Sequence, residues 1–281
     1  MMRSTGKGFG FSSWMLVAGL AFLYLPMFIL IFYSFNASKL VTVWGGFSTH
    51  WYIDLFKDEQ LMGAVWTSLK IGFYNASMAI VLGTLAAYIL ARFGSFRGRT
   101  AFSSMITAPL VMPDVITGLS LLLLFVTMAD WFGWPADRGM LTIWIAHVTF
   151  STAYVAVVVG ARLKELDTSI EEAALDLGAT PFKAFFLITL PTIAPALVSG
   201  WLLAFTLSLD DLVIASFVSG PGATTLPMVV FSSVRMGVSP KINALATLII
   251  LLVSLATLVG WWFMRRAERE RRASLSRFDQ E

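Results

Sequence analysis

The chain has 281 residues, of which 57% are hydrophobic and only 13% charged, and its mean hydropathy is +0.77. Soluble globular domains carry roughly 25% charged residues, so this composition excludes an ordinary soluble protein and predicts a membrane protein. Cysteine is absent, which excludes disulfides and thiolate metal sites, and the presence of only two histidines speaks against a histidine-based metal site.

Long uncharged runs predict six transmembrane helices. A helix needs about 20 apolar residues to cross the hydrocarbon core of a bilayer. Because lipid offers no partner for backbone N–H and C=O groups, the spans should be helical. The expected spans cover about 14–35, 64–91, 102–128, 140–161, 194–217 and 242–264. We therefore expect an all-α polytopic membrane protein that forms a single transmembrane domain over residues 1–281, with a partly ordered outer loop at 36–63.

Lysine and arginine are distributed unevenly between the expected connections. Fourteen lie on the side that carries both termini and five on the other, and six of the fourteen are arginines between 265 and 277. Cytoplasmic loops carry the excess of Lys and Arg, which predicts that both termini are cytoplasmic. The first run, 14–33, lacks a small-residue cleavage pattern and is interpreted as a retained anchor. Orientation and anionic lipid explain the arginine-rich tail, and we expect no nucleic-acid binding.

The cytoplasmic segment 163–191 has helix start and stop signals in sequence. Thr168 and Ser169 each precede a glutamate by three residues, as in a capping box, and Gly178 stands where a helix C-cap belongs. Thr180 and Pro181 then start a second helix as N-cap and first-turn proline. One apolar face is expected from Ile170, Ala173, Ala174 and Leu177. The segment is thus predicted to be a short amphipathic helix, a sharp turn and another helix.

This amphipathic helix has two candidate partners, the bilayer surface and another protein. A helix that rests on anionic lipid is usually rich in Lys and Arg. The segment is instead acidic, with Glu165, Asp167, Glu171, Glu172 and Asp176. A protein partner is therefore the better interpretation.

The same segment carries a family resemblance. Glu172-Ala173-Ala174, then Gly178, then Leu190-Pro191, resembles the EAA loop of ABC importer permeases, which docks on a cytoplasmic ATPase. From about residue 22 to 264 the chain is similar to the polyamine importer permeases, most of all to the second permease subunit of putrescine importers. This likeness is carried by SKLVTVWGGFSTHWY (38–52), MITAPLVMPDVITGLSLLLLF (105–125), GWPADRGMLTIW (133–144) and LSLDDLVIASFVSGPGATTLPMVVFSSVRMG (207–237).

The resemblance implies the other subunits of an importer. It implies a heterodimer with a second, homologous permease, an ATPase dimer, a periplasmic polyamine-binding protein, and a place in the bacterial inner membrane. ATP and Mg would be bound by the partner ATPase and no cofactor by this chain, which agrees with the absence of a GxxxxGK[ST] phosphate-binding loop. The expected role is that of a transport subunit rather than an enzyme, with putrescine crossing the membrane by alternating access.

Three carboxylates fall in or beside the expected spans: Asp114, Asp210 and Asp211. A charge at mid-bilayer is costly and should face protein or water, which makes each a candidate contact for a cationic substrate. Neighbours on a helix differ by about 100° in direction, so Asp210 and Asp211 should have different surroundings. Trp201 and Phe205 lie near them at helical spacing and are candidate pathway aromatics, with packing as the alternative.

Asp114 follows Pro113, where the third span should be kinked or unwound because a proline removes a helical hydrogen bond. Its carboxylate either contacts a cation beside freed carbonyls or caps the next helix through the N–H of Ile116 or Thr117. His147 is expected to be a hydrogen-bonded interhelical residue. Close helix approach is expected at Gly83, Gly118, Gly160 and Gly200.

Three other functions compete with putrescine import. The substrate could be spermidine or another small cation, because selectivity could reside in the binding protein. An ion-coupled secondary transporter could use the same aspartates, but it would have no ATPase for an EAA-type loop to contact. An intramembrane aspartyl protease needs a motif such as GxGD, which the chain lacks.

Overall fold

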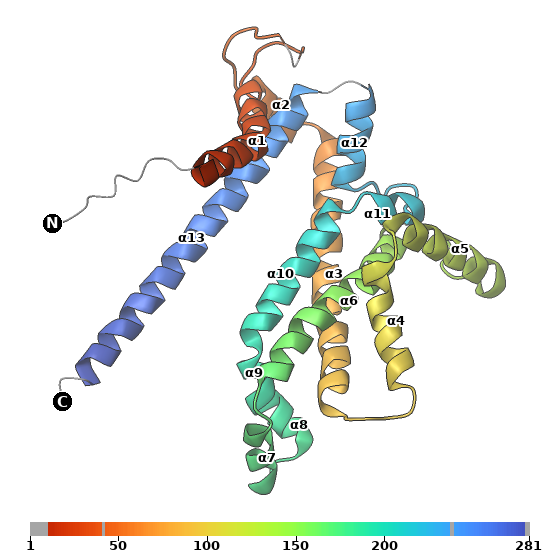
Figure 1. The fold of residues 1–281 in the computed structure, drawn as a ribbon. Helices are drawn as coiled ribbons and strands as arrows, with labels where there is room; N and C mark the ends of the chain where they lie inside the picture. Colours follow the sequence, from red (N-terminus) through yellow and green to blue (C-terminus); the bar gives the residue numbers. More distant parts are fainter. Residues whose placement is uncertain (1–10, 41–42, 237–238, 279–281) are drawn as a thin grey trace, which may run out of the picture. The chain divides into compact units, whose positions relative to one another are not determined.

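The computed structural model describes the chain except for residues 1–10, 41–42, 237–238 and 279–281. The described part is almost entirely helical, with one isolated antiparallel bridge between Asn36 and Phe47 as its β pairing. The chain divides into two compact units. One is Gln60–Ser232, and the other combines Met1–Glu59 with Ser233–Glu281. Both units are built from helices (Figure 1).

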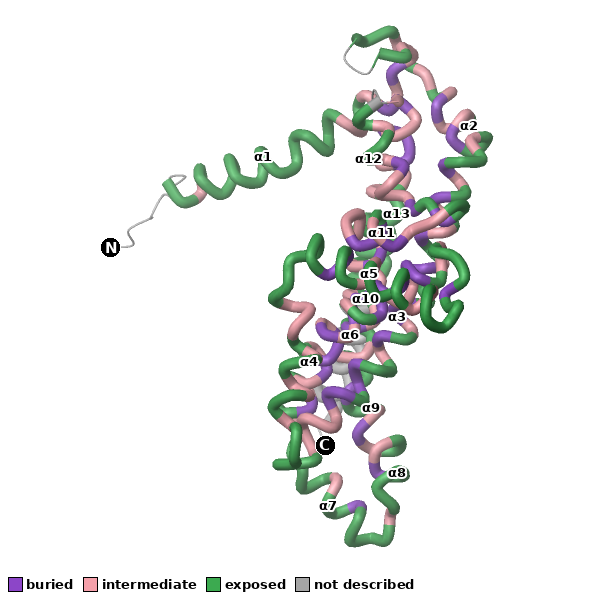
Figure 2. Tube along the Cα trace, turned by 90° about the vertical axis from the view of Figure 1, so that its right-hand side faces the viewer, coloured by how far each residue is buried: buried purple, intermediate pink, exposed green. Residues whose placement is uncertain are grey.

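The terminal unit contains three helices. They are α1 (Phe11–Tyr33), α2 (His50–Phe56) and α13 (Pro240–Phe278). None of the α1 residues is buried, and the helix is exposed along its length (Figure 2). The outer loop is organised by Asn36, whose Oδ1 accepts the backbone N–H of Gly45 at 2.7 Å and whose Nδ2 donates to the carbonyl of Val43 at 2.8 Å. These hydrogen bonds hold the described part of the loop on either side of residues 41–42, and the loop contains α2.

The other unit is built around long helices α3 (Glu59–Arg92), α6 (Met140–Glu165) and α10 (Ala194–Asp210). The remaining elements are α4 (Arg99–Val111), α5 (Asp114–Phe132), α7 (Ser169–Asp176), α8 (Pro181–Ala184), the π-helix η1 (Phe185–Thr189), α9 (Leu190–Thr192), α11 (Val213–Val218) and α12 (Leu226–Met236). Small residues such as Ala76, Ala79 and Ala204 bring α3 and α10 together with α6 in one buried cluster.

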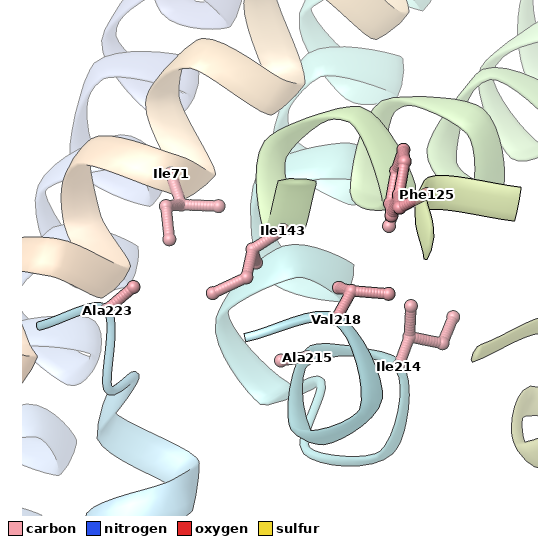
Figure 3. Close-up of a cluster of buried hydrophobic side chains, with 8 residues drawn as sticks. Ile71, Phe125, Ile143, Ile214, Ala215, Val218 and Ala223 are labelled. Carbon is pink, nitrogen blue, oxygen red and sulfur yellow. The ribbon is translucent and has the colours of Figure 1, made fainter. Parts of the chain in front are cut away.

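A second buried cluster positions α11 (Figure 3). Ile214 and Val218 of α11 pack with Phe125 of α5 and Ile143 of α6, and each of the four is at most 2% exposed. Thr142 adds a polar contact, because its hydroxyl donates to the carbonyl of Val218 at 2.7 Å. The short helix α11 is thus fixed between α5 and α6.

Five described helices are long and apolar enough to cross a bilayer, and a sixth crossing results if the bent pair Pro181–Thr192 and Ala194–Asp210 counts as one span. The two halves of that pair meet at 71°. A π-helix precedes the bend and Pro195 follows it, and both features commonly accompany kinks. The fold class predicted from the sequence, an all-α polytopic membrane protein, is confirmed.

One expected span is broken where the sequence predicted a kink or an unwound turn, and another was wrong as a continuous helix. The span at 102–128 is two helices, because α4 ends at Val111 and α5 begins at Asp114, on either side of the break expected at Pro113. The span at 194–217 is also interrupted, because Asp211 takes an extended backbone conformation after α10 ends. The other four lie within α1, α3, α6 and α13 to within two residues, and α13 continues well past residue 264.

Candidate functional site

The two neighbouring aspartates lie where α10 ends and α11 begins. Asp210 is the last residue of α10, and Asp211 is extended, with ψ at 121°. The carboxylate of Asp211 accepts two backbone N–H groups of α11, from Ile214 at 3.2 Å and from Ala215 at 2.7 Å. Asp211 therefore caps the first turn of α11.

His147 of α6 joins the same carboxylate. Its Nε2 lies 3.1 Å from Oδ2 of Asp211, and its Nδ1 lies 2.7 Å from the hydroxyl of Ser208 on α10. The His147 side chain is 2% exposed and that of Asp211 11%. An ionised Asp211 carboxylate can only accept hydrogen bonds, and Nε2 would then carry the hydrogen. His147 is thus the interhelical hydrogen-bonded residue that the sequence predicted.

Asp210 has different surroundings. It is exposed, and it lies within electrostatic range of Asp114, Asp211 and His147. One aspartate of the pair is held inside the chain and the other is exposed, so the predicted difference in surroundings is confirmed. Its cause is the end of α10 between them, and not the 100° step of a continuous helix.

Asp114 is exposed in the first turn of α5. The N–H groups of Ile116 and Thr117 both donate to the carbonyl of Pro113, at 3.0 and 3.1 Å, and the helix has no side-chain cap. The capping alternative was therefore wrong. Asp114 comes close enough to Asp210 for the two charges to interact.

The aromatic candidates pack against α3. Trp201 and Phe205 stack with ring centroids 5.3 Å apart, and Trp201 meets Phe73 edge-on at 5.8 Å. The indole N–H of Trp201 donates to the hydroxyl of Ser77 at 3.3 Å. These contacts hold the two rings within α10 and against α3, which is the packing alternative that the sequence left open.

The segment 163–191 has the helix, turn and helix that the sequence predicted. Gly178 has φ at +84°, and the N–H of Ala179 donates to the carbonyl of Ala174 at 3.0 Å, which closes a Schellman-type end to α7. Thr180 caps α8 by accepting the N–H of Lys183 at 3.3 Å, and Pro181 begins that helix.

The start of α7 differs from the expected capping box. The side chain of Thr168, which holds the N-cap position, makes no capping bond. Asp167 instead accepts the N–H of Ser169 at 3.0 Å, and this backbone hydrogen bond, aided by the Ser169 side chain, holds the pKa of Asp167 below its ordinary value. The sequence pattern predicted Thr168 or Ser169 as the cap and missed the carboxylate of Asp167, which comes immediately before them.

The side chains of the expected apolar face of α7 are largely exposed, because few other residues of this chain pack on them. Ala174 is buried, but Ile170 is 54% exposed and Leu177 is 89% exposed. Glu172, Ala173, Gly178 and Pro191 are exposed as well, while Leu190 packs partly buried against the α3, α6 and α10 cluster. These exposed side chains form a mixed apolar and acidic surface suited to a protein partner.

The ion pair between Arg92 and Glu171 was not predicted. Arg92, the last residue of α3, approaches Glu171 of α7 with Nη2 3.0 Å from Oε1 and Nε 3.0 Å from Oε2. The hydroxyl of Thr189 on η1 donates to the same carboxylate at 2.9 Å. No local spacing links residues 92, 171 and 189, so the sequence carried no signal for this contact.

Comparison with known proteins places the chain in a family. Residues 79–273 match the model of the family described as binding-protein-dependent transport system inner membrane component. The chain is 68% identical to the putrescine transport system permease protein PotI of Escherichia coli strain K12, over 93% of each protein. It is 43% identical to the spermidine/putrescine transport system permease protein PotC of Haemophilus influenzae, over 85% of this chain and 90% of that one.

Solved structures agree on the fold. A bacterial ABC transporter involved in the import of the acidic polysaccharide alginate matches with a TM-score of 0.72 at 18% identity, covering 94% of this chain and 99% of that chain. At this identity the match shows the fold alone. The chain belongs to the inner membrane components of binding-protein-dependent transport systems, the permease subunits of ABC importers, and is a multi-pass transport subunit of the polyamine type rather than an enzyme.

Proposed function

We propose that this chain is a permease subunit of an ATP-driven importer that moves putrescine across the bacterial inner membrane. The observation that carries the proposal is the 68% identity to a putrescine permease over 93% of both proteins. Spermidine is the second candidate substrate, because relatives at 43% identity are named for both polyamines. The higher identity to the putrescine-specific relative favours putrescine.

The proposed machine has four other kinds of component besides the bilayer: a second homologous permease, an ATPase dimer that binds ATP and Mg, a periplasmic polyamine-binding protein, and putrescine itself. The excess of Lys and Arg on one side supports cytoplasmic termini. Six crossings, with the bent pair as one, suit a single transmembrane permease domain.

We assign the ATPase contact to the exposed surface of α7 and the turn after it. Glu172, Ala173 and Gly178 lie on this surface, and the exposed Leu177 supplies the apolar area that a docking contact needs. Of the other candidate residues, Ala174 is buried, Leu190 is partly buried and Pro191 is exposed. We assign them to the same coupling segment. ATP-driven closure of the ATPase pair would then tilt the attached spans and expose the pathway alternately to the two sides.

We assign the handling of the cationic substrate first to Asp210 and Asp114. Both are exposed and lie at breaks between helices, where irregular backbone commonly lines a cavity. Asp211 would act indirectly, by fixing the break through His147. Trp201 and Phe205 would line the pathway only where their rings extend beyond their packing on α3.

The test is uptake by the complete importer reconstituted in liposomes. We expect ATP-dependent uptake of putrescine, weaker uptake of spermidine and none of a neutral solute of similar size. Equal uptake of all three, or uptake that continues without the ATPase, would contradict the proposal.

A further inference from the structure

The cytoplasmic end of α3 is joined to the segment that follows α6 by one compact set of polar contacts. Arg92, Glu171 and Thr189 come from three different elements, namely α3, α7 and η1. They are the set that we call the Arg92 clamp. All three lie in the unit formed by Gln60–Ser232.

The geometry of the Arg92 clamp is that of a specific contact. The guanidinium of Arg92 faces both carboxylate oxygens of Glu171, and the hydroxyl of Thr189 donates to Oε1 at 2.9 Å. Nε and Nη2 of Arg92 both donate to Oε1, at 3.2 and 3.0 Å, so donors from two residues converge on that oxygen and hold the carboxylate in place. The side chains of Arg92 and Glu171 are 12% and 16% exposed, and Thr189 is 1% exposed. Water therefore has little access to the contact.

Neighbouring contacts hold the three elements in place. Tyr88 of α3 meets Phe185 of η1 edge-on, with ring centroids 4.8 Å apart. Beyond the end of α3, Arg99 donates to the carbonyls of Leu90 and Gly94, so the last turn of α3 is tied down as well. These contacts therefore connect α7, η1 and the end of α3 at several points, and we expect a displacement of α7 to move the other two elements with it.

The two adjacent glutamates of α7 differ in what they contact. Glu171 points to Arg92 and Thr189 inside the chain, whereas Glu172 is exposed. We propose that Glu171, Arg92 and Thr189 are positioning residues that make α7, the end of α3 and η1 move as one body, and so transmit the motion of the ATPase to the membrane spans. This inference rests on the proposed function, since it names the joint within that same coupling segment.

The Arg92 clamp reaches the candidate pathway by two routes. Through Arg92 it connects to α3, which is 34 residues long and continues from the clamp to Glu59. Through Thr189 it connects to η1, α9 and then α10, whose last residue is Asp210. Tilting α7 would therefore move both a spanning helix and the end of α10, which is the two-state rigid-body coupling that alternating access requires.

The test uses the complete reconstituted importer and spin labels. This chain contains no cysteine, so the exposed Ser95→Cys and Asp176→Cys give it two labelling sites, one in the turn just after α3 and one at the end of α7. The other subunits are used in cysteine-free form. We expect the distance between the labels to stay the same in the resting and the ATP-trapped states. In Arg92→Gln we expect it to shift or broaden between the two states.

Transport per ATP is the second readout. Arg92→Gln should lower putrescine uptake per ATP hydrolysed by at least about fivefold, the lower end of typical coupling effects, while the ATPase still co-purifies. Arg162→Gln is the matched control, because Arg162 pairs with Glu165 at 3.1 Å within α6 alone and joins no two elements. If Arg92→Gln fails to assemble, Thr189→Val is used in its place, because it removes only the hydroxyl that donates to Glu171. We expect the same change in label distance and the same loss of uptake per ATP.

Two results would overturn the inference. One is a label distance that already changes between states in the unsubstituted importer. The other is an uptake-to-hydrolysis ratio that Arg92→Gln leaves unchanged. The label distance does not depend on the substrate, so a failure of putrescine uptake in the unsubstituted importer would count against the proposed function alone.

Discussion

The imidazole Nε2 of His147 lies 3.1 Å from the carboxylate Oδ2 of Asp211, and this hydrogen bond joins α6 to the break between α10 and α11. The same carboxylate caps α11, and Ser208 occupies the other ring nitrogen at 2.7 Å. Asp211 thus fixes the direction in which the chain leaves α10. Its neighbour Asp210 stays exposed.

Asparagine substitutions at the two positions should separate these roles. Asp211→Asn removes the charge that accepts from His147 and from α11, and hydrogen bonds to charged groups contribute about 1.5–3 kcal/mol each. We expect a loss of stability within that range, seen as a lower melting temperature of the purified subunit pair. Asp210→Asn should leave the melting temperature unchanged and reduce putrescine uptake.

The two substitutions are matched controls for each other, because both neutralise one carboxylate at the same break. Equal melting temperatures would show that the Asp211 contact contributes nothing to stability. Undiminished uptake by Asp210→Asn would remove that residue from the pathway.

Close contact between α3 and α6 predicts a second effect. A Cβ on Gly83 would lie 2.5 Å from Cγ1 of Val155, a side chain with no exposed surface. Gly83→Ala should therefore destabilise the subunit by about 1–3 kcal/mol, as overpacking in a core does. Thermal melting in detergent measures it.

Gly63 is the control in the same helix, because a Cβ there would meet no atom within 4 Å. Gly63→Ala should be neutral or slightly stabilising, since alanine favours helix by up to about 1 kcal/mol over glycine. Identical melting behaviour of the two variants would show that α3 and α6 are not packed as closely as the structure has them.

The features that the sequence predicted correctly are local ones. The break at Pro113 follows from the chemistry of proline, and the end of α7 at Gly178 follows from the left-handed conformation that glycine adopts easily. The tight approach at Gly83 follows from its missing side chain. Each of these depends on one residue and its immediate neighbours, which a sequence displays directly.

The contacts that the sequence did not predict join distant positions. His147 and Asp211 are 64 residues apart, and Arg92 and Glu171 are 79 apart. Helical periodicity tells which residues share a face but not which face of another helix lies opposite. The break after Asp210 was missed for the same reason. Asp211 lies outside the helix and contacts His147 and the first turn of α11, and neither contact can be read from local sequence.

Glu172, an exposed acidic residue of α7, gives the last prediction. Glu172→Lys reverses a charge on the surface assigned to the ATPase contact, and it should weaken association with the ATPase because like or mismatched charges at an interface oppose docking. Glu165→Lys is the control, since Glu165 is the last residue of α6 and its side chain is 68% exposed. Co-purification of the ATPase with the membrane subunits measures the effect, which should increase at low salt and diminish at high salt because exposed charges are screened. Equal recovery of the ATPase with both variants at low salt would place the docking contact elsewhere than on α7.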